Sequence, residues 1–187
     1  PSGTIADFEI DESLNLIYVL GSPGTATALS PDQVKAQDDF RHYINPGWLS
    51  LIHYERDSLG EAAPMHGLGY FNLPQDLIPT DMVLGTQHLY VTAASHHFPH
   101  IDTEYEDQNW LLVYDREEGS TFDGTEQPDG KNRQIRYSVP LPFDRAPDQV
   151  LVKDNLLVVR EHDGQIVIFS LHDPLRPSII QTIETID

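Results

Sequence analysis

The sequence contains no cysteine, which excludes disulfide bonds and thiolate metal sites. Basic residues are scarce too: 11 lysines and arginines oppose 30 aspartates and glutamates, so the formal net charge is -19. Binding to nucleic acid through its phosphates needs a basic face, which this composition does not supply. Anionic membranes are disfavoured as partners for the same reason. A surface this acidic attracts cations instead.

Long apolar runs are missing as well. No stretch approaches the roughly 20 apolar residues that cross a bilayer, so membrane insertion is not expected. The segment Pro1–Thr4 lacks the basic and apolar regions of a signal peptide, and the start at Pro1 suggests a processed or excised segment. An acidic, cysteine-free chain fits a bacterial secreted or cell-surface protein and is also compatible with a cytosolic one.

What the sequence does contain is one pattern repeated along the chain. The approximate copies are residues 5–74, 75–142 and 143–187. Each copy has four short segments rich in Val, Ile, Leu, Tyr and Phe and bounded by Gly, Pro, Asn or Asp, which is typical of β-strands. Repeated four-stranded antiparallel units predict an all-β fold of about three β-propeller blades, read as a single propeller segment over residues 1–187.

The links between the second and third expected strands differ in length. They cover residues 21–47 in the first copy and 95–109 in the second, but only Glu161–Gly164 in the third. In a propeller these links share one face of the disc, so the two long ones should crowd that face. Loops on a rigid scaffold commonly carry binding sites. Residues 21–47 and 95–109 are therefore the predicted partner face, with a protein or a carbohydrate as the expected ligand.

The third copy resembles the LVIVD-type repeat of bacterial β-propellers, most clearly over residues 146–177. The resemblance lies in four segments: Ala146–Val150, Leu156–Val159, Gly164–Ile168 and Asp173–Pro177. The second copy is similar at Leu89–Val91 and Leu111–Asp115, and the first is similar more loosely. The resemblance implies a propeller fold and no particular reaction.

Three blades do not close a propeller, which usually needs 4–8 blades. The favoured interpretation is that the chain is part of a larger propeller whose other blades belong to the same parent protein. Alternatively, two chains form one six-bladed ring, or residues 22–46 hide a fourth blade. An irregular β-sandwich is the competing fold, since many short strands also indicate sandwiches.

Three aspartates precede the first expected strand of the copies at similar places: Asp7, Asp81 and Asp148. A short carboxylate readily accepts backbone N–H bonds at a tight turn, so a structural role between blades is the favoured interpretation. The alternative is that they are cation ligands near the central channel.

One segment of the second copy combines imidazoles with carboxylates. The candidate metal ligands are His96, His97, His100, Asp102, Glu104 and Asp107. Histidines and a carboxylate so close together suit Zn²⁺, and alternating carboxylates suit Ca²⁺, although no EF-hand order is present. The sequence names no cofactor; Ca²⁺ is favoured over Zn²⁺.

The two tryptophans, Trp48 and Trp110, each begin the third expected strand of a copy, which favours packing over sugar stacking. No nucleophile elbow or phosphate-binding glycine loop occurs. The sequence therefore predicts a non-catalytic binding or scaffolding module of a larger bacterial exported or surface protein. The alternatives are a metal-dependent hydrolase or oxidoreductase that gathers His and Asp, and a structural shell of a toxin or surface assembly.

Overall fold

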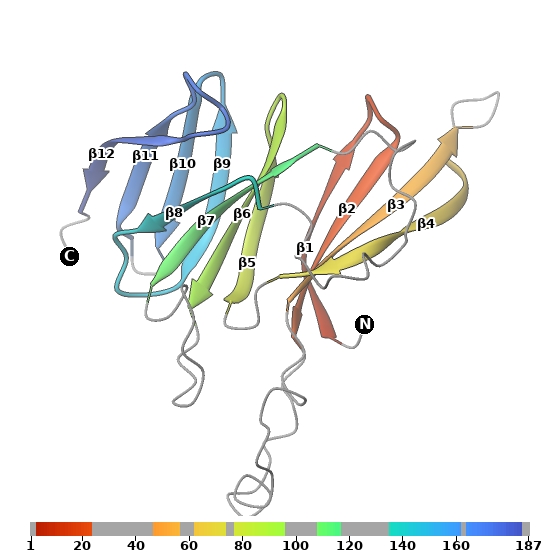
Figure 1. The fold of residues 1–187 in the computed structure, drawn as a ribbon, viewed down its shortest axis with the longest axis horizontal. Coiled ribbons are helices and arrows are strands. Elements are labelled where there is room, and N and C mark those ends of the chain that lie inside the picture. The colour runs from red at the N-terminus through yellow and green to blue at the C-terminus, as the bar shows by residue number, and fades with distance from the viewer. Residues whose placement is uncertain are drawn as a thin grey trace, which may run out of the picture.

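The chain folds into three four-stranded antiparallel sheets (Figure 1). The computed structural model describes residues 3–23, 47–56, 62–73, 77–95, 108–116, 135–161 and 164–184. Within these ranges no helix is long and apolar enough to cross a membrane. The twelve strands are β1 (Gly3–Asp11), β2 (Leu16–Pro23), β3 (Trp48–Arg56), β4 (Ala62–Asn72), β5 (Leu77–Leu84), β6 (His88–Ser95), β7 (Asn109–Asp115), β8 (Tyr137–Leu141), β9 (Pro147–Lys153), β10 (Leu156–Glu161), β11 (Ile166–Ser170) and β12 (Ser178–Ile183).

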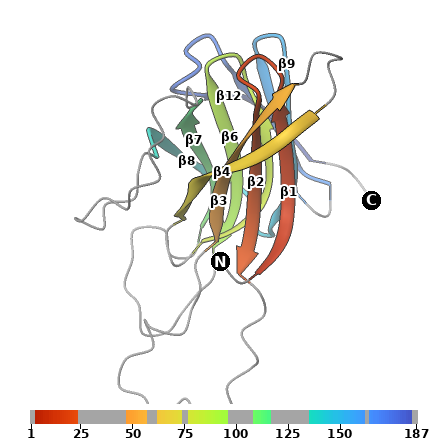
Figure 2. The same ribbon diagram turned by 90° about the vertical axis from the view of Figure 1, so that its right-hand side faces the viewer.

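The three sheets stack in series, in chain order. Within each sheet, neighbouring strands are also neighbours in sequence. The first strand of the middle sheet, β5, contacts β1 on one side and β9 on the other. Viewed from one end of the stack, β1 and β9 lie on the same side (Figure 2). This arrangement resembles successive propeller blades rather than a two-sheet sandwich, and the described residues do not form a closed ring.

Two apolar layers hold the stack together. Adjacent residues of β7 show the principle: Leu112 faces the first sheet and Leu111 faces the third, because successive side chains of a strand point to opposite faces. Both side chains are fully buried. The middle sheet is covered on both faces, so β6 and β7 contain uninterrupted apolar runs, Leu89–Val91 and Trp110–Tyr114, rather than a strict alternation with polar residues.

The first strand of every sheet carries a bulge at the same place. In each case one residue has no ladder partner: Ala6 in β1, Thr80 in β5 and Asp148 in β9. The residues that follow, Asp7, Asp81 and Gln149, are therefore equivalent in the three ladders. A bulge sharpens the local twist and redirects side chains.

Candidate functional site

A group of carboxyl side chains lies where the first strands of neighbouring sheets meet. Asp7 of β1 accepts a hydrogen bond through Oδ2 from the backbone N of Met82 in β5, at 3.2 Å. Asp81 of β5 accepts the equivalent bond from the backbone N of Val150 in β9, at 2.7 Å. Each aspartate thus connects its own sheet to the backbone of the next one.

These carboxyl groups also interact with each other. Burial raises the pKa of Asp81 to about 6, and the hydrogen bond and negative charge of Asp7 add to the rise, although the N–H of Val150 opposes it. The pKa of Glu9 is raised as well, first by burial and then by Asp7. Asp81 therefore retains its proton in mildly acidic solution.

The chemistry of this group is structural in the described part of the chain. Each of the two aspartates uses an oxygen to bind a backbone N–H, and the two side chains also share a hydrogen bond. Among the described residues, no three His, Asp or Glu side chains come together in a way that could hold a metal ion. The interpretation of Asp7 and Asp81 as cation ligands gains no support from this geometry.

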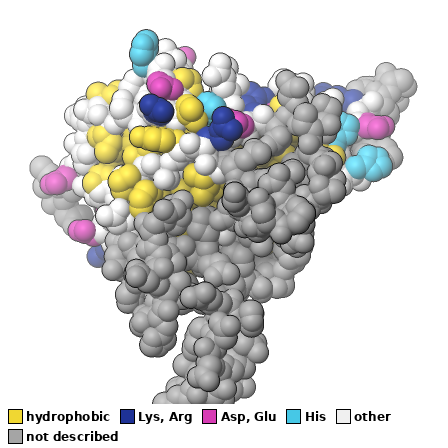
Figure 3. Space-filling view, viewed as in Figure 1, with side chains coloured by type: hydrophobic (Ala, Val, Ile, Leu, Met, Phe, Trp, Pro, Cys, Tyr) yellow, Lys and Arg dark blue, Asp and Glu magenta, His cyan; other side chains and the backbone are white. Residues whose placement is uncertain are grey.

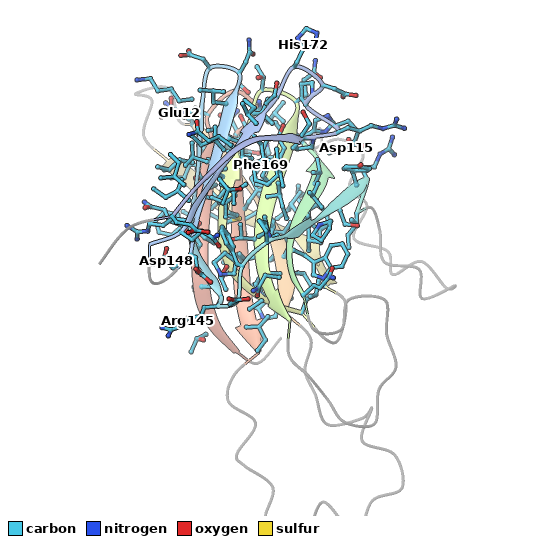
Figure 4. The ribbon with its side chains drawn as sticks, turned by 90° about the vertical axis from the view of Figure 1, so that its left-hand side faces the viewer. Glu12, Asp115, Arg145, Asp148, Phe169 and His172 are labelled. Carbon is cyan, nitrogen blue, oxygen red and sulfur yellow. The ribbon has the colours of Figure 1, made fainter. Side chains whose placement is uncertain are left out.

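Asp148 behaves differently from the other two aspartates. It is itself the bulged residue of β9, one ladder position before Gln149, the equivalent of Asp81. Its carboxylate binds Arg160 of its own sheet, with Oδ1 at 2.9 Å from Nε. Figure 4 shows Asp148 beside Arg145 at one end of the third sheet, with His172 at the other end. In the middle sheet the bulged residue is Thr80, whose hydroxyl lies 2.9 Å from that of Thr92.

The predicted metal segment lies outside the described residues. This holds for all six candidate ligands, His96, His97, His100, Asp102, Glu104 and Asp107. Most of the two long links, residues 24–46 and 96–107, also lies outside, as does the stretch proposed to hide a fourth blade. Only the residues from which the links start and end are described.

The two tryptophans occupy equivalent ladder positions. Trp48 pairs with Gly21, and Trp110 pairs with Ala93 at the same place in the next sheet. Trp48 is buried, and its indole lies directly on Gly21, where a Cβ atom would come within 1.9 Å of the ring. Glycine is required there because the ring fills the space of a side chain. Trp110 packs against the core between the first two sheets. Packing, rather than sugar stacking, is therefore the role that their contacts support.

An ion pair that the sequence analysis did not foresee joins the first two sheets. The buried carboxylate of Asp11, at the end of β1, binds the guanidinium of Arg116, just after β7. Arg116 also donates to the carbonyl of Thr86, at 2.8 Å. Burial alone would raise the pKa of Asp11, but hydrogen bonds from Ser13, Arg116 and Leu14 outweigh it and lower that pKa. The two residues are far apart in sequence, so no local sequence pattern predicts this ion pair.

A second polar cluster lies at the same end of the middle sheet. His88 and Asp115 are ladder partners, with Nδ1 and Oδ1 3.1 Å apart, and Arg136 Nε lies 3.2 Å from Oδ2 of Asp115. The corresponding ladder pairs are Leu16 with His53 in the first sheet and Leu156 with Ser170 in the third. The cluster thus belongs to the middle sheet alone among the described residues.

Comparison with known protein families, with curated proteins and with solved structures finds no match to this chain. The LVIVD resemblance therefore rests on its residues alone. The propeller-like arrangement of the sheets rests on the structure itself.

Proposed function

We propose that this protein is a non-catalytic binding or scaffolding module, and that residues 21–47 and 95–109 form its partner face. The observation that supports this proposal is that the two long links start and end at equivalent ladder positions in two neighbouring sheets. The first spans the pair Gly21–Trp48 and the second spans the pair Ala93–Trp110. The scaffold thus anchors two long segments at the same edge of neighbouring sheets.

The residues at the ends of these links form hydrogen bonds with the segments that connect one sheet to the next. The carbonyl of Gly47 accepts the N–H of Leu73, at 2.6 Å, where the chain leaves the first sheet. The amide of Asn109 donates to the carbonyls of Phe143 and Arg145, at 3.0 and 2.9 Å, where the chain leaves the middle sheet. Rigid anchors lower the entropic cost of positioning a binding segment.

The third sheet supplies a natural short form of the same link. Its turn is closed by hydrogen bonds from the N of Glu161 to the carbonyl of Gln165, at 2.8 Å, and from the N of Gly164 to the carbonyl of Glu161, at 3.0 Å. Gly164 has a φ of 108°, a backbone conformation that favours glycine. The sequence His162-Asp163-Gly164 can therefore replace a long link in an experiment.

The test replaces residues 96–107, or residues 24–46, by His-Asp-Gly. Binding is screened on an array of defined oligosaccharides and on a phage-displayed peptide library. We expect the replaced chains to keep their β circular-dichroism spectrum and to bind any selected ligand at least about tenfold more weakly.

The matched control is the same replacement of residues 117–133. These residues join β7 to β8 at the end of β7 that lies away from the two long links. This variant should bind as the unaltered chain does. Failure to select any ligand, or binding that survives both link replacements, would contradict the proposal.

A further inference from the structure

The two end sheets each expose an apolar face that resembles the buried faces of the stack. Figure 1 places β1–β4 at one end and β9–β12 at the other. Figure 3 shows hydrophobic side chains gathered on the described surface at the β9–β12 end. Both end sheets have second strands that are apolar along most of their length, Leu16–Leu20 in β2 and Leu156–Val159 in β10. Such strands are typical of sheets covered on both faces.

The open face of the first sheet repeats a face that is buried elsewhere. In the ladder, Phe8 is equivalent to Met82 and Val150. Met82 and Val150 are both 2% exposed, whereas Phe8 is 59% exposed. We call this surface the leading face; it consists of Phe8, Ile10, Ile17, Val19, Ser50 and Ile52.

The open face of the third sheet repeats the opposite buried face. Val158 and Ile168 are ladder partners equivalent to Tyr90 and Val113 of the middle sheet, which are buried against the third sheet. Leu151, in line with them, is 52% exposed. We call this surface the trailing face; its apolar side chains are Leu151, Leu156, Val158, Ile166 and Ile168, and the ladder also places Gln149, Lys153, Arg160 and Ser170 on it.

Both apolar layers between sheets, in the part of the chain that the structure describes, join a trailing face to a leading face. The trailing face of the first sheet packs against the leading face of the middle sheet, and the trailing face of the middle sheet packs against the leading face of the third. The unpaired faces at the two ends are therefore of complementary type. Continuing the same contact needs another sheet of this design, which a second copy of the chain supplies.

We propose that two copies associate head to tail, with the trailing face of each on the leading face of the other. Such a contact is heterologous, and it stops at two copies only if the ring closes. Two copies contribute six sheets, twice the three of one chain, which lies within the 4–8 blades that close a propeller. Closure also removes both exposed apolar faces.

The first experiment measures the mass of the full chain in solution by sedimentation and light scattering over a range of micromolar concentrations. We expect a mass twice the 21.1 kDa of one chain, without further growth as the concentration rises. A monomer throughout would overturn the proposal, and so would an assembly that grows beyond two copies.

The second experiment places a charge on each face by Phe8→Asp and Leu151→Asp. Both side chains are exposed in the single chain, so each variant should fold, which circular dichroism and thermal unfolding verify. Either variant alone should be monomeric, with a dissociation constant raised about 100-fold or more, because a carboxylate would be buried in an apolar contact. The control Tyr137→Asp, on the outermost strand of the middle sheet, should leave the dimer intact.

Mixing the two variants identifies which faces meet. A Phe8→Asp chain keeps its trailing face and a Leu151→Asp chain keeps its leading face, so the mixture should form a one-to-one heterodimer through one intact contact. If one variant alone remained fully dimeric, the substituted face would not take part in the dimer contact, and the head-to-tail proposal would fail.

Discussion

Individual carboxyl groups couple the sheets of this protein by two different means. Asp7 and Asp81 accept backbone N–H bonds from the next sheet, whereas Asp11 forms an ion pair with a side chain of the next sheet. Asp81 combines burial with a hydrogen bond to Asp7 and the negative charge of that residue, and its pKa is raised. The raised pKa of Asp81 and the lowered pKa of Asp11 both make stability depend on pH, in opposite senses: the contribution of Asp81 is lost as the pH rises, and that of Asp11 is lost as the pH falls.

Asp81→Asn should remove a pH dependence of stability. Folded Asp81 holds its proton up to about pH 6, against an ordinary pKa of 3.8, so between these values the folded state binds more protons than the unfolded state. The free energy of unfolding should then fall as the pH rises from about 4 to about 6. The fall should be roughly 1–2 kcal/mol, since solvent screens this half-buried group.

Urea unfolding at pH 4 to 7.5 measures this slope. The asparagine mimics the protonated acid and can still accept the N–H of Val150, so the variant should be at least as stable as the unaltered chain at pH 7.5. Asp148→Asn, which changes an aspartate outside the pair, should keep the slope. A slope that persists in Asp81→Asn would show that the proton resides elsewhere.

Arg116→Ala should lower the free energy of unfolding by about 2–4 kcal/mol, because it leaves the carboxylate of Asp11 buried without its charge partner. In a double-mutant cycle with Asp11→Ala, the coupling should be about 1–3 kcal/mol. The exposed pair Arg160–Asp148 is the control, with an expected coupling under about 1 kcal/mol. Equal couplings for the two pairs would refute the role of burial.

At the scale of the elements, close packing fixes where the long links leave their sheets. Gly21 and Trp48 end β2 and begin β3, and the indole occupies the space that a side chain at Gly21 would need. At the equivalent pair, Ala93 and Trp110, a methyl group is accommodated. The first link is therefore anchored by a closer contact than the second.

Gly21→Ala should destabilise the fold by about 1–3 kcal/mol, because the added methyl would overlap the ring of Trp48. Gly67→Ala is the control, since a Cβ atom there would have no neighbour within 4 Å. Thermal unfolding measures stability, and near-ultraviolet circular dichroism reports the displaced indole. Equal effects of the two substitutions would mean that the ring moves aside without cost.

The acidic segment between β6 and β7 is predicted to bind Ca²⁺ weakly, with a dissociation constant on the order of 10⁻⁴–10⁻³ M, as in extracellular modules. Calorimetric titration of the unaltered chain with Ca²⁺ should give a heat of binding. The double variant Glu104→Gln/Asp107→Asn should give none. The control Asp144→Asn changes an exposed carboxylate elsewhere and should keep the heat. Zn²⁺ binding is tested by the same titration. The double variant His96→Ala/His100→Ala should lose the heat of Zn²⁺ binding, and the control His172→Ala should keep it. An absence of heat with either ion would refute the metal site.

At the scale of the whole molecule, we expect the middle sheet to make the stack unfold as one cooperative unit. Its two faces contribute to both apolar layers, so neither layer survives the loss of that sheet. Tyr90 extends this coupling through a hydrogen bond from its hydroxyl to the carbonyl of Pro174, at 2.8 Å.

Leu111→Ala and Leu112→Ala test this cooperativity with neighbouring residues. Both leucines are fully buried, but they face different layers. Each substitution should lower the free energy of unfolding by about 2–5 kcal/mol and shift one common transition. Tryptophan fluorescence and far-ultraviolet circular dichroism should give coincident urea curves. Separate transitions for the two variants would show that the layers unfold independently.

The sequence by itself determined the strands and their grouping into sheets. Strand identity follows from local composition: β-branched and aromatic runs between turn residues predict the four-stranded units. It also placed the two tryptophans at equivalent positions.

Only the tertiary structure decided which side chains connect the sheets. The spacing of Asp7, Asp81 and Asp148 suggested one shared role, but the three first strands bulge at the same place and Asp148 is itself the bulged residue, one position before the equivalent of Asp7 and Asp81, where it contacts Arg160 of its own sheet. The pair of Asp11 with Arg116 joins residues that are distant in the chain. Ladder register and packing between sheets depend on contacts across the whole stack, which local patterns do not encode.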